Sequence, residues 1–502
     1  MNLKNLLIAI YLLHALCMQQ VVAQGVNNLW LGGYDSWAGA PNGGVDIDFQ
    51  SGNREVGYAD RAIGFYRCNT TISDANGALL ASSNGSFLGN SLGDTLLNGS
   101  GLSPSFYTDL YPDGLYMNQA VLLLPRPVQQ VGESTNIYFL FHGTIDDGPN
   151  SAAAYLYLTT IDMAGDGGLG EAVSKNEIVI TDALNQGKIT AVRHANGRDW
   201  WVYCRKTNSN IFYRLLVTPD GVSVDGTQAI GIVRPADVGQ VCFSPDGTKF
   251  AYYWGVDDLE VFDFDRCTGL FSDPVFIPIE DTNTNAGVAF SPNSRFLYVS
   301  SVMDIYQFDT DAADIEASMV HLGMWDGFYS PSPPFATAFG LAQLAPDGKI
   351  YLSTGNSTFH LHVIHDPDQP GLACNLEQHG VELDRWFSNS LPNHPNYHLG
   401  PIDGSVCDSL GINVGVAETQ NIIDVQAFPN PTNGNFQVTY PAHATVGVLH
   451  VLDANGKVVY EQRIPQWSTV HAVQLAEQAG GMYHCRLVWG NEKLTTRIIV
   501  QE

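Results

Sequence analysis

A turn flanked by two apolar strands recurs along the middle of the chain, and this repeat constrains the fold more than any other feature. Residues 241–253 contain an apolar strand, a Ser-Pro-Asp-Gly turn and an aromatic strand. Similar units occupy residues 288–299 and 343–352. Proline presets the first dihedral of such a turn, and Gly or Asn accepts the positive φ that follows. The pattern predicts repeated β-hairpins.

The spacing of these turns predicts how the hairpins assemble. Weaker copies centre on Asn76, Ser134 and Asn196, and the six turn markers are separated by 58, 62, 50, 47 and 54 residues. A third strand follows the three strong copies, at 259–265, 305–311 and 361–366. A period near 50 residues with three or four short strands is typical of a β-propeller, whose blades bury their faces against one another.

The composition agrees with an all-β chain. Hydrophobic residues make up 45% and charged residues only 15%, with Gly 50 and Pro 25, which favours strands and tight turns over long helices. We therefore expect a β-propeller over residues 24–410, with about seven blades completed near Trp30 or Trp386. Eight blades, or six with long insertions, are the alternatives.

The charge of the chain limits its partners. Lys and Arg number 23 against 51 Asp and Glu, a net charge of −28, and this field opposes binding to nucleic acid. Residues 24–417 hold 44 acidic and 17 basic residues, whereas residues 418–502 hold seven and five. The acidity belongs to the body, and its partners are expected to be neutral, cationic or bridged by metal ions.

The N-terminus has the pattern of a secretory signal peptide. Lys4 precedes an apolar run over 6–18, and the small Ala23 follows at a cleavage position. The run is shorter than the ~20 residues that a spanning helix needs. We expect a signal peptide at 1–23 and no transmembrane segment in the mature chain, because no later run reaches ~18 apolar residues.

The C-terminal part differs from the body in its pattern. Two prolines and a glycine open it, alternating strands follow, and the Asn455-Gly456 pair marks a β-hairpin turn. These features predict a small β-sandwich at 428–502, joined to the body by a linker at 411–427.

This C-terminal part resembles the sorting domain of proteins exported by the type IX (Por) secretion system of Bacteroidota. The resemblance rests on the Phe-Pro-Asn-Pro opening, the Asp-x-x-Gly-Lys hairpin, the Gly-x-Tyr strand and the basic-apolar last strand. It implies export by the type IX machinery to the outer-membrane surface or the medium, usually with removal of the domain. The chain ends in Glu502 where that family commonly has Lys. The motif residues are Phe428, Pro429, Asn430, Pro431, Gly434, Asp453, Gly456, Lys457, Gly481 and Tyr483.

The cysteines are compatible with export. Six lie between the signal and the C-terminal domain, at Cys68, Cys204, Cys242, Cys267, Cys374 and Cys407. Six cysteines allow fifteen disulfide connectivities, and none forms a Cys-x-x-Cys pair. Several could instead be buried strand residues.

Candidate metal ligands are few. His360 and His362 would share one face of a strand, whereas His365 falls on the other, and surface histidines of an outer strand explain the three better than a Zn or Cu site does. His394 and His398 flank Pro395, which argues against a helical pair, and we do not assign them as ligands. Acidic stretches at 146–150, 162–166 and 280–285 could bind Ca²⁺ but lack EF-hand spacing. We assign no metal or cofactor.

The function is predicted at the level of class. The body resembles the WD40-like propellers of exported bacterial proteins and, more loosely, lactonase-type propellers. We expect a binding module that recognises an extracellular glycan, peptide or matrix component on its loop-bearing face. The alternative is a secreted lyase, lactonase or glycan hydrolase with metal or paired carboxylates at the channel mouth. No catalytic motif decides between these, so the question of enzymatic activity stays open.

Overall fold

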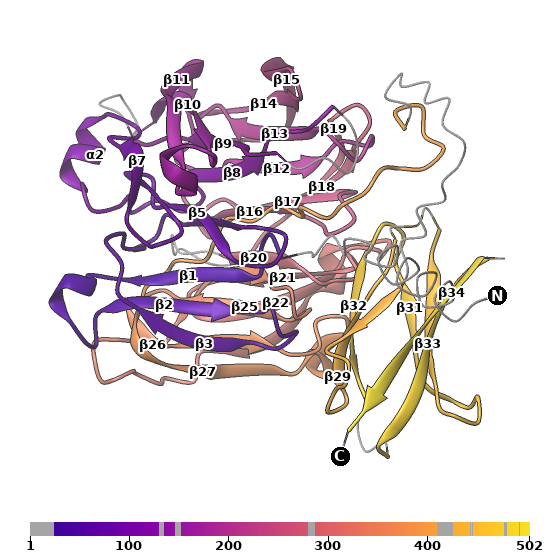
Figure 1. Ribbon diagram of the computed structural model, residues 1–502. Helices are drawn as coiled ribbons and strands as arrows, with labels where there is room; N and C mark the ends of the chain where they lie inside the picture. The colour runs from indigo at the N-terminus through magenta and orange to yellow at the C-terminus, as the bar shows by residue number, and fades with distance from the viewer. Residues whose placement is uncertain are drawn as a thin grey trace, which may run out of the picture.

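The computed structural model describes residues 25–129, 135–145, 152–279, 287–408, 425–441, 443, 445–475, 479–490 and 492–501. The predicted signal peptide, the acidic stretches 146–150 and 280–285, and the linker residues 411–424 lie outside the described residues. The described chain is almost entirely β-structure, in a large body and a smaller C-terminal domain (Figure 1).

The first half of the body forms three sheets, of which the first and third are antiparallel and the second is mixed. The first sheet contains β1 (Leu29–Tyr34), β2 (Gly43–Asp48) and β3 (Glu55–Ala59). The second has eight strands in the order β4-β5-β6-β7-β11-β10-β9-β8: β4 (Thr70–Ser73), β5 (Leu79–Ser83), β6 (Phe87–Gly89), β7 (Thr95–Ser100), β8 (Val121–Pro125), β9 (Ile137–His142), β10 (Ala153–Asp162) and β11 (Glu171–Leu184). The third contains β12 (Thr190–Arg193), β13 (Trp200–Arg205), β14 (Ser209–Thr218) and β15 (Gly221–Arg234).

The second half of the body contains three further sheets of four strands each. They are β16 (Gln240–Phe243), β17 (Lys249–Trp254), β18 (Asp258–Asp265) and β19 (Leu270–Ile277); β20 (Gly287–Phe290), β21 (Phe296–Ser300), β22 (Asp304–Asp309) and β23 (Val320–Met324); and β24 (Phe339–Leu344), β25 (Ile350–Thr354), β26 (Thr358–Ile364) and β27 (Leu376–Phe387). Short helices lie in the connections: η1 (Ser36–Ala38), α2 (Phe106–Leu110), η3 (Asp166–Gly168), η4 (Glu316–Ser318) and η5 (Gly371–Cys374).

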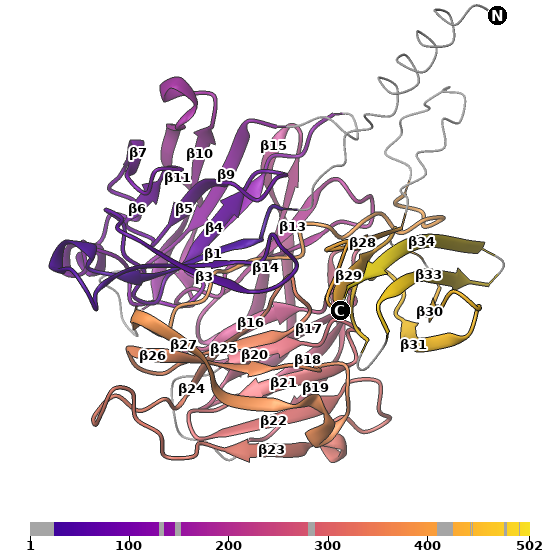
Figure 2. The same cartoon turned by 60° about the horizontal axis from the view of Figure 1, so that its bottom comes forward.

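The sheets form a β-propeller. Each four-stranded sheet is an antiparallel meander in chain order, and the first strands of neighbouring sheets contact one another: β12 with β16, β16 with β20, and β20 with β24. Successive sheets lie side by side (Figure 2). The strong turn repeats became the first hairpins of three sheets, and the three predicted third strands are β18, β22 and β26. These predictions are confirmed.

The ring closes between the first and last sheets. β1 and β2 contact β27, and the Phe387 ring lies so close to Gly32 that a Cβ there would approach it to 2.0 Å. The segments near Trp30 and Trp386 thus complete the ring together. The two halves of the eight-stranded sheet, β4–β7 and β8–β11, are joined by a single parallel pair between β7 and β11, Leu97 with Glu171. Dividing it there would give seven units, and seven blades remains our prediction.

The cores of the body lie between adjacent sheets. One cluster joins β17, β18 and β19 to β20 and β21, where Tyr253, Leu259, Ile277, Val288 and Leu297 are all buried. A strand in such a position packs on both faces, which is why its sequence is nearly continuously apolar. Hydrophobic burial between neighbours therefore holds each sheet in the ring.

After β27 the chain enters the middle of the ring, and we call residues 388–400 the plug. The Asn389 Oδ1 atom accepts a hydrogen bond from the Leu341 amide at 3.0 Å. Further along, the Tyr397 hydroxyl donates to the Leu123 carbonyl at 2.8 Å, and Arg266 donates to the Gly400 carbonyl at 2.5 Å. These partners belong to three different sheets or their connections, so the plug ties the blades together from inside.

Asn393 makes the densest set of contacts in the plug. Its Nδ2 donates to the Val121 and Ile189 carbonyls, both at 2.8 Å, and its Oδ1 accepts from Gln119 Nε2 at 3.1 Å. Its backbone amide donates to the Asn69 carbonyl at 2.9 Å. One buried side chain thus satisfies polar groups of two neighbouring inner strands.

Glutamines also bridge strands that are distant in sequence. The Gln119 carboxamide bonds both backbone groups of Val241 at 2.9 Å. Gln240 does the same to Ala342, donating to its carbonyl at 2.6 Å and accepting from its amide at 2.9 Å. Buried backbone groups need such partners, so these amides close the interior of the ring.

The C-terminal domain packs two sheets around one core. β28 (Gln426–Phe428), β29 (Asn435–Thr439) and β32 (Val470–Gln474) form the first sheet, and β31 (Val458–Ile464), β30 (Gly447–Leu452), β33 (Gly481–Trp489) and β34 (Glu492–Val500) form the second. Phe436, Val451, Tyr483, Leu487 and Ile498 are buried between them. The predicted sandwich is present, and its first strand begins two residues before the predicted boundary at 428.

One disulfide joins the body to the segment that leaves it. Cys267, after β18, is bonded to Cys407, beyond the plug. Cys68, Cys204, Cys374 and Cys485 are free and buried, and Cys242 is free and half-buried. Both earlier interpretations therefore apply: one pair is cross-linked, and the other described cysteines are mainly interior residues.

We predict that Asn393→Ala lowers the free energy of unfolding by about 2–4 kcal/mol, because it leaves two buried carbonyls without donors. Urea denaturation of the purified chain measures this change. Asn53→Ala, at an exposed asparagine, is the matched control and should change stability by less than about 0.5 kcal/mol. A loss below about 1 kcal/mol for Asn393→Ala would contradict the plug's role.

A second prediction concerns pH. His142 lies between the Ser103 and Thr159 hydroxyls, and burial lowers its pKa from 6.5 to about 3. The unfolded chain therefore binds more protons than the folded one below about pH 6.5, so stability is lost as the pH falls from there towards 3. His142→Gln should make the loss between about pH 7.5 and pH 5 smaller by about 2 kcal/mol. Equal losses in urea denaturation of both proteins would exclude this origin.

Candidate functional site

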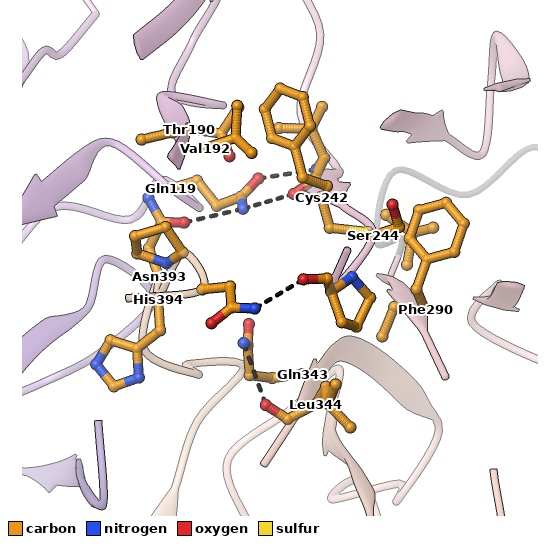
Figure 3. Close-up of a pocket in the computed structure, with 18 of the residues that line it drawn as sticks. Gln119, Thr190, Val192, Cys242, Ser244, Phe290, Gln343, Leu344, Asn393 and His394 are labelled. Carbon is orange, nitrogen blue, oxygen red and sulfur yellow. Dashed lines mark hydrogen bonds between the residues drawn. The ribbon is translucent and has the colours of Figure 1, made fainter. Parts of the chain in front are cut away.

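The interior of the ring holds a small cavity of about 60 Å³. Its walls come from the inner strands β12, β16, β20 and β24 and from plug residues 393–396. Figure 3 shows the Gln119 and Asn393 side chains turned towards each other and towards the neighbouring backbone. The Asn396 Nδ2 atom donates to the Pro245 carbonyl at 2.7 Å. The cavity is large enough for a water molecule or two and too small for a sugar or peptide.

The chemistry of this cavity does not support catalysis. Its lining residues include no Asp, Glu or Lys. His394 is the one histidine in the lining, and an ordinary histidine titrates near neutrality. Burial lowers the pKa of His394 to about 4, and its Nε2 atom already contacts the hydroxyl and carbonyl of Thr71. Across the described residues, no group of three or more His, Cys, Asp or Glu side chains could hold a metal ion. This cavity therefore supplies neither the paired carboxylates nor the metal centre that the enzyme alternative requires.

The three clustered histidines of β26 and its end do not form a site. His362 is buried, and its Nδ1 accepts a hydrogen bond from the His379 amide at 2.9 Å. His360 contacts the Ser330 hydroxyl at 2.8 Å, and His365 contacts Glu377 at 2.7 Å. The expectation of three surface histidines is wrong for His362, because β26 lies between β25 and β27 in its sheet and the His362 ring packs against Phe339 of β24.

A second hollow, of about 690 Å³, lies between the body and the C-terminal domain. Arg54 and Lys349 line it from the body, and Glu461 and Gln474 line it from the domain. At its edge Asp368 and His471 approach to 3.9 Å, and burial raises the pKa of Asp368 to about 7 while lowering that of His471 to about 4. The hollow is part of the contact between the two domains.

Four connections at the other end of the body gather aromatic side chains, and three of them carry exposed ones. The four connections are residues 35–42, 60–69, 101–120 and 325–338, and we call their common surface the aromatic face. In Figure 1 the β1–β2 connection and α2 lie at the left, and the C-terminal domain lies at the right. Seven aromatic side chains of the described residues are exposed, and five lie in these connections: Trp37, Phe106, Tyr116, Phe328 and Tyr329.

Stacked tyrosines support one half of the aromatic face. The Tyr66 ring stacks on Tyr34 at 4.8 Å and on Tyr116 at 5.2 Å between centroids. Tyr111 continues the row, 4.8 Å from Tyr116, and Tyr107 lies 4.7 Å beyond it. Because the inner rings cover one another's faces, they act as a rigid support beneath the exposed side chains at the margin.

A second aromatic group continues the face across the closure of the ring. The Trp386 ring lies between Phe359 at 4.3 Å and Phe335 at 4.9 Å. The Trp386 amide donates to the Pro41 carbonyl at 2.8 Å, which links this group to the first connection. The 325–338 and 35–42 connections are therefore parts of one surface.

The phenols of this face stay protonated at neutral pH. Burial is the main cause that raises the pKa of Tyr34, Tyr66 and Tyr116, and it raises that of Tyr107 to about 12. The Tyr66 hydroxyl donates to the Asp35 carboxylate. Sequence reasoning missed this face, although the Tyr-rich stretch at 107–116 was a visible signal.

The predicted sorting-motif residues have structural roles in the C-terminal domain. The Asn430 side chain bonds the Arg497 carbonyl and the Ile499 amide, both at 2.9 Å, which fastens the opening to β34. The Asp453 Oδ1 atom accepts from the Asn455 and Lys457 amides at 2.9 Å. Gly434 and Gly456 have positive φ values of 104° and 79°. A residue with a side chain would be strained in this backbone conformation, whereas glycine adopts it readily.

The remaining motif residues lie at strand ends and in the core. Gly481 begins β33, and the Tyr483 hydroxyl donates to the Ala479 carbonyl at 2.7 Å from a buried ring. Phe428 ends β28, and Pro429 and Pro431 follow it in the opening segment. Their role in export is not tested by this geometry and stays a prediction.

Comparisons with solved structures return proteins of low sequence identity. A protein from Lactobacillus plantarum is 12% identical, with 89% of this chain and 100% of that chain covered and a TM-score of 0.36. A putative 6-phosphogluconolactonase from Bacteroides fragilis is 12% identical, with coverage of 74% and 99% and a TM-score of 0.39. The Dos1 propeller is 11% identical, with coverage of 66% and 92% and a TM-score of 0.34. No curated protein sequence matches the chain.

The C-terminal domain is identified by its family. Residues 426–501 match the secretion system C-terminal sorting domain. None of the helices in the described part of the chain has the length and apolar character needed to cross a bilayer. The protein is therefore a β-propeller with a C-terminal sorting domain of the type IX secretion system, which indicates secretion or attachment to the cell surface.

Proposed function

We propose that the propeller is an extracellular binding module and that the aromatic face is its binding surface. The type IX machinery would deliver the chain, and the face would then recognise a glycan, a peptide or a matrix component. The single observation that carries the proposal is the concentration of five exposed aromatic side chains on three of the four connections of the aromatic face.

Exposed aromatic side chains in such numbers need an explanation. Burying an aromatic side chain is favourable, so a soluble protein rarely leaves a contiguous set in water unless the set meets a partner. Tyr and Trp offer a partner large contact areas at little cost in conformational entropy. The stacked row behind Tyr116 and the hydrogen bonds of the first connection add the rigidity that binding surfaces need.

The other parts of the molecule favour this face over the interior. The plug and the bridging glutamines fill the ring, and the cavity that remains is about 60 Å³. The C-terminal domain lies against the opposite end of the body, where Gln437 donates to the Pro346 carbonyl. A surface attachment made through that domain would leave the aromatic face directed away from the anchor.

The proposal is tested by retention of the full mature chain on arrays of extracellular glycans and peptides. We expect binding to at least one ligand class, and a loss of about tenfold or more in the double variant Trp37→Ala/Tyr116→Ala. Phe276→Ala is the matched control, because Phe276 is an exposed aromatic residue within the outer strand β19. It should bind like the unmodified chain.

Two outcomes would count against the proposal. Binding that is unaffected by the double variant would place the site elsewhere on the molecule. Turnover of lactones or glycans that survives the double variant would favour the enzyme alternative.

A further inference from the structure

We propose that the aromatic face binds a cationic polypeptide segment, with Trp37 as its central contact. This inference rests on the proposed function, since it names the ligand class of the same surface. It depends on three features: the support of Trp37, the signs of the exposed charges, and the kind of contact that an indole ring makes with cations.

The Trp37 side chain is exposed to solvent, although the backbone that carries it is fixed by hydrogen bonds. Its side chain is 87% exposed, yet its neighbours are fixed on both sides. Asp35 has a φ of 55° and accepts a hydrogen bond from the Tyr66 hydroxyl, and the Ser36 hydroxyl accepts one from the Arg61 amide at 3.0 Å. An unusual backbone conformation that the surroundings enforce is typical of functional positions. Both ends of the connection are fixed by hydrogen bonds, and the indole is the one large side chain of its exposed tip, residues 37–41.

The far end of the same connection is also fixed. The Pro41 carbonyl accepts from the Trp386 amide at 2.8 Å, and the Asn42 carbonyl accepts from Arg385 at 3.2 Å. Both donors come from β27, the last strand of the ring. The backbone position of Trp37 is therefore set by the closure of the propeller. Binding a partner would cost little conformational entropy, because this connection is already ordered.

The exposed charged residues of the aromatic face have one sign. Within the four connections of the aromatic face, the exposed charged residues are Asp60, Asp109, Asp113 and Asp326. The two basic residues of these connections, Arg61 and Arg67, are half-buried, and Arg61 is paired with Asp46 at 2.5 Å. A partner that carries Lys or Arg would be attracted to this surface, and an acidic one would be repelled.

An indole adds a specific contact to this field. The face of a Trp ring attracts ammonium and guanidinium groups more strongly than Tyr or Phe does, and its apolar area also packs on the methylene stems of Lys and Arg. A neutral sugar could stack on the ring and donate hydroxyl hydrogen bonds to single carboxylates, but it would gain no attraction from the net negative charge of the four. The combination therefore favours a basic peptide over a neutral glycan.

The test uses the full mature chain and three fluorescent probes. They are a twelve-residue peptide of alternating Arg and Gly, the matched Glu-Gly peptide, and a neutral hexasaccharide of N-acetylglucosamine. We expect the basic peptide alone to bind, with an affinity that falls steeply from about 50 mM to about 300 mM NaCl. Trp37→Ala should weaken its binding about tenfold.

A pair of charge-matched variants separates this surface from the general acidity of the protein. Asp109→Asn/Asp113→Asn removes two carboxylates of the aromatic face, and Asp263→Asn/Asp273→Asn removes two exposed carboxylates from β18 and β19. Both variants make the net charge less negative by the same amount. The first should weaken binding of the basic peptide and flatten its salt dependence, and the second should leave both unchanged.

The remaining outcomes overturn the inference in distinguishable ways. Equal weakening by both double variants, with no effect of Trp37→Ala, would mean that the overall negative field attracts the peptide. Trp37-dependent binding of the hexasaccharide without binding of the basic peptide would reject a cationic ligand and leave the proposed binding function intact. Absence of basic-peptide binding would reject the inference, while the array experiment would judge the binding function separately.

Discussion

The hydrogen bonds of Asn393 in the middle of the ring are the interaction on which the rest of the structure depends. A propeller joins its first and last sheets only by side contacts, and a strand that passes through the centre can add bonds that a ring alone lacks. Here the carboxamide of Asn393 contacts two inner-strand carbonyls, and its backbone amide contacts the Asn69 carbonyl. Each of these groups is buried, so losing the plug would leave several backbone groups without partners.

The filled interior moves the functional question to the ends of the propeller. One end meets the sorting domain, where Gln437 and Ala472 approach the turn at 346–348. The other end carries the aromatic face. This division would place delivery and the proposed recognition at opposite ends of one molecule, so that neither surface would have to change for the other to work.

The sequence predicted features that depend on neighbouring residues, such as turns and short motifs. It did not predict contacts between segments that are distant in the chain. The Pro-Asp-Gly turns and their following strands predicted the hairpins because turn chemistry depends on a few adjacent residues. The sorting domain could be recognised because its motifs lie within one stretch. By contrast, the sequence around Pro395 predicted only that His394 and His398 are not a helical pair, and the partners of Asn393 at Gln119, Val121 and Ile189 lie more than 200 residues away.

The candidate site shows the same limit. His360, His362 and His365 are close in sequence, but strand alternation and the packing of β26 separate their environments. The aromatic face is the opposite case, since its residues come from four connections whose proximity only the closed ring creates. Likewise, the partner of Cys407 could not be chosen from sequence, because Cys267 is 140 residues away.

The most direct test of the central claim is hydrogen exchange in the peptides that cover residues 388–400 of the intact chain. The Asn393 amide is hydrogen-bonded to the Asn69 carbonyl at 2.9 Å inside the ring. The account predicts that this segment exchanges only when the propeller unfolds as a whole, as slowly as the inner strands β16 and β20 do. Exchange of the segment within seconds, as in an unstructured peptide, would show that the interior is open and would contradict the account.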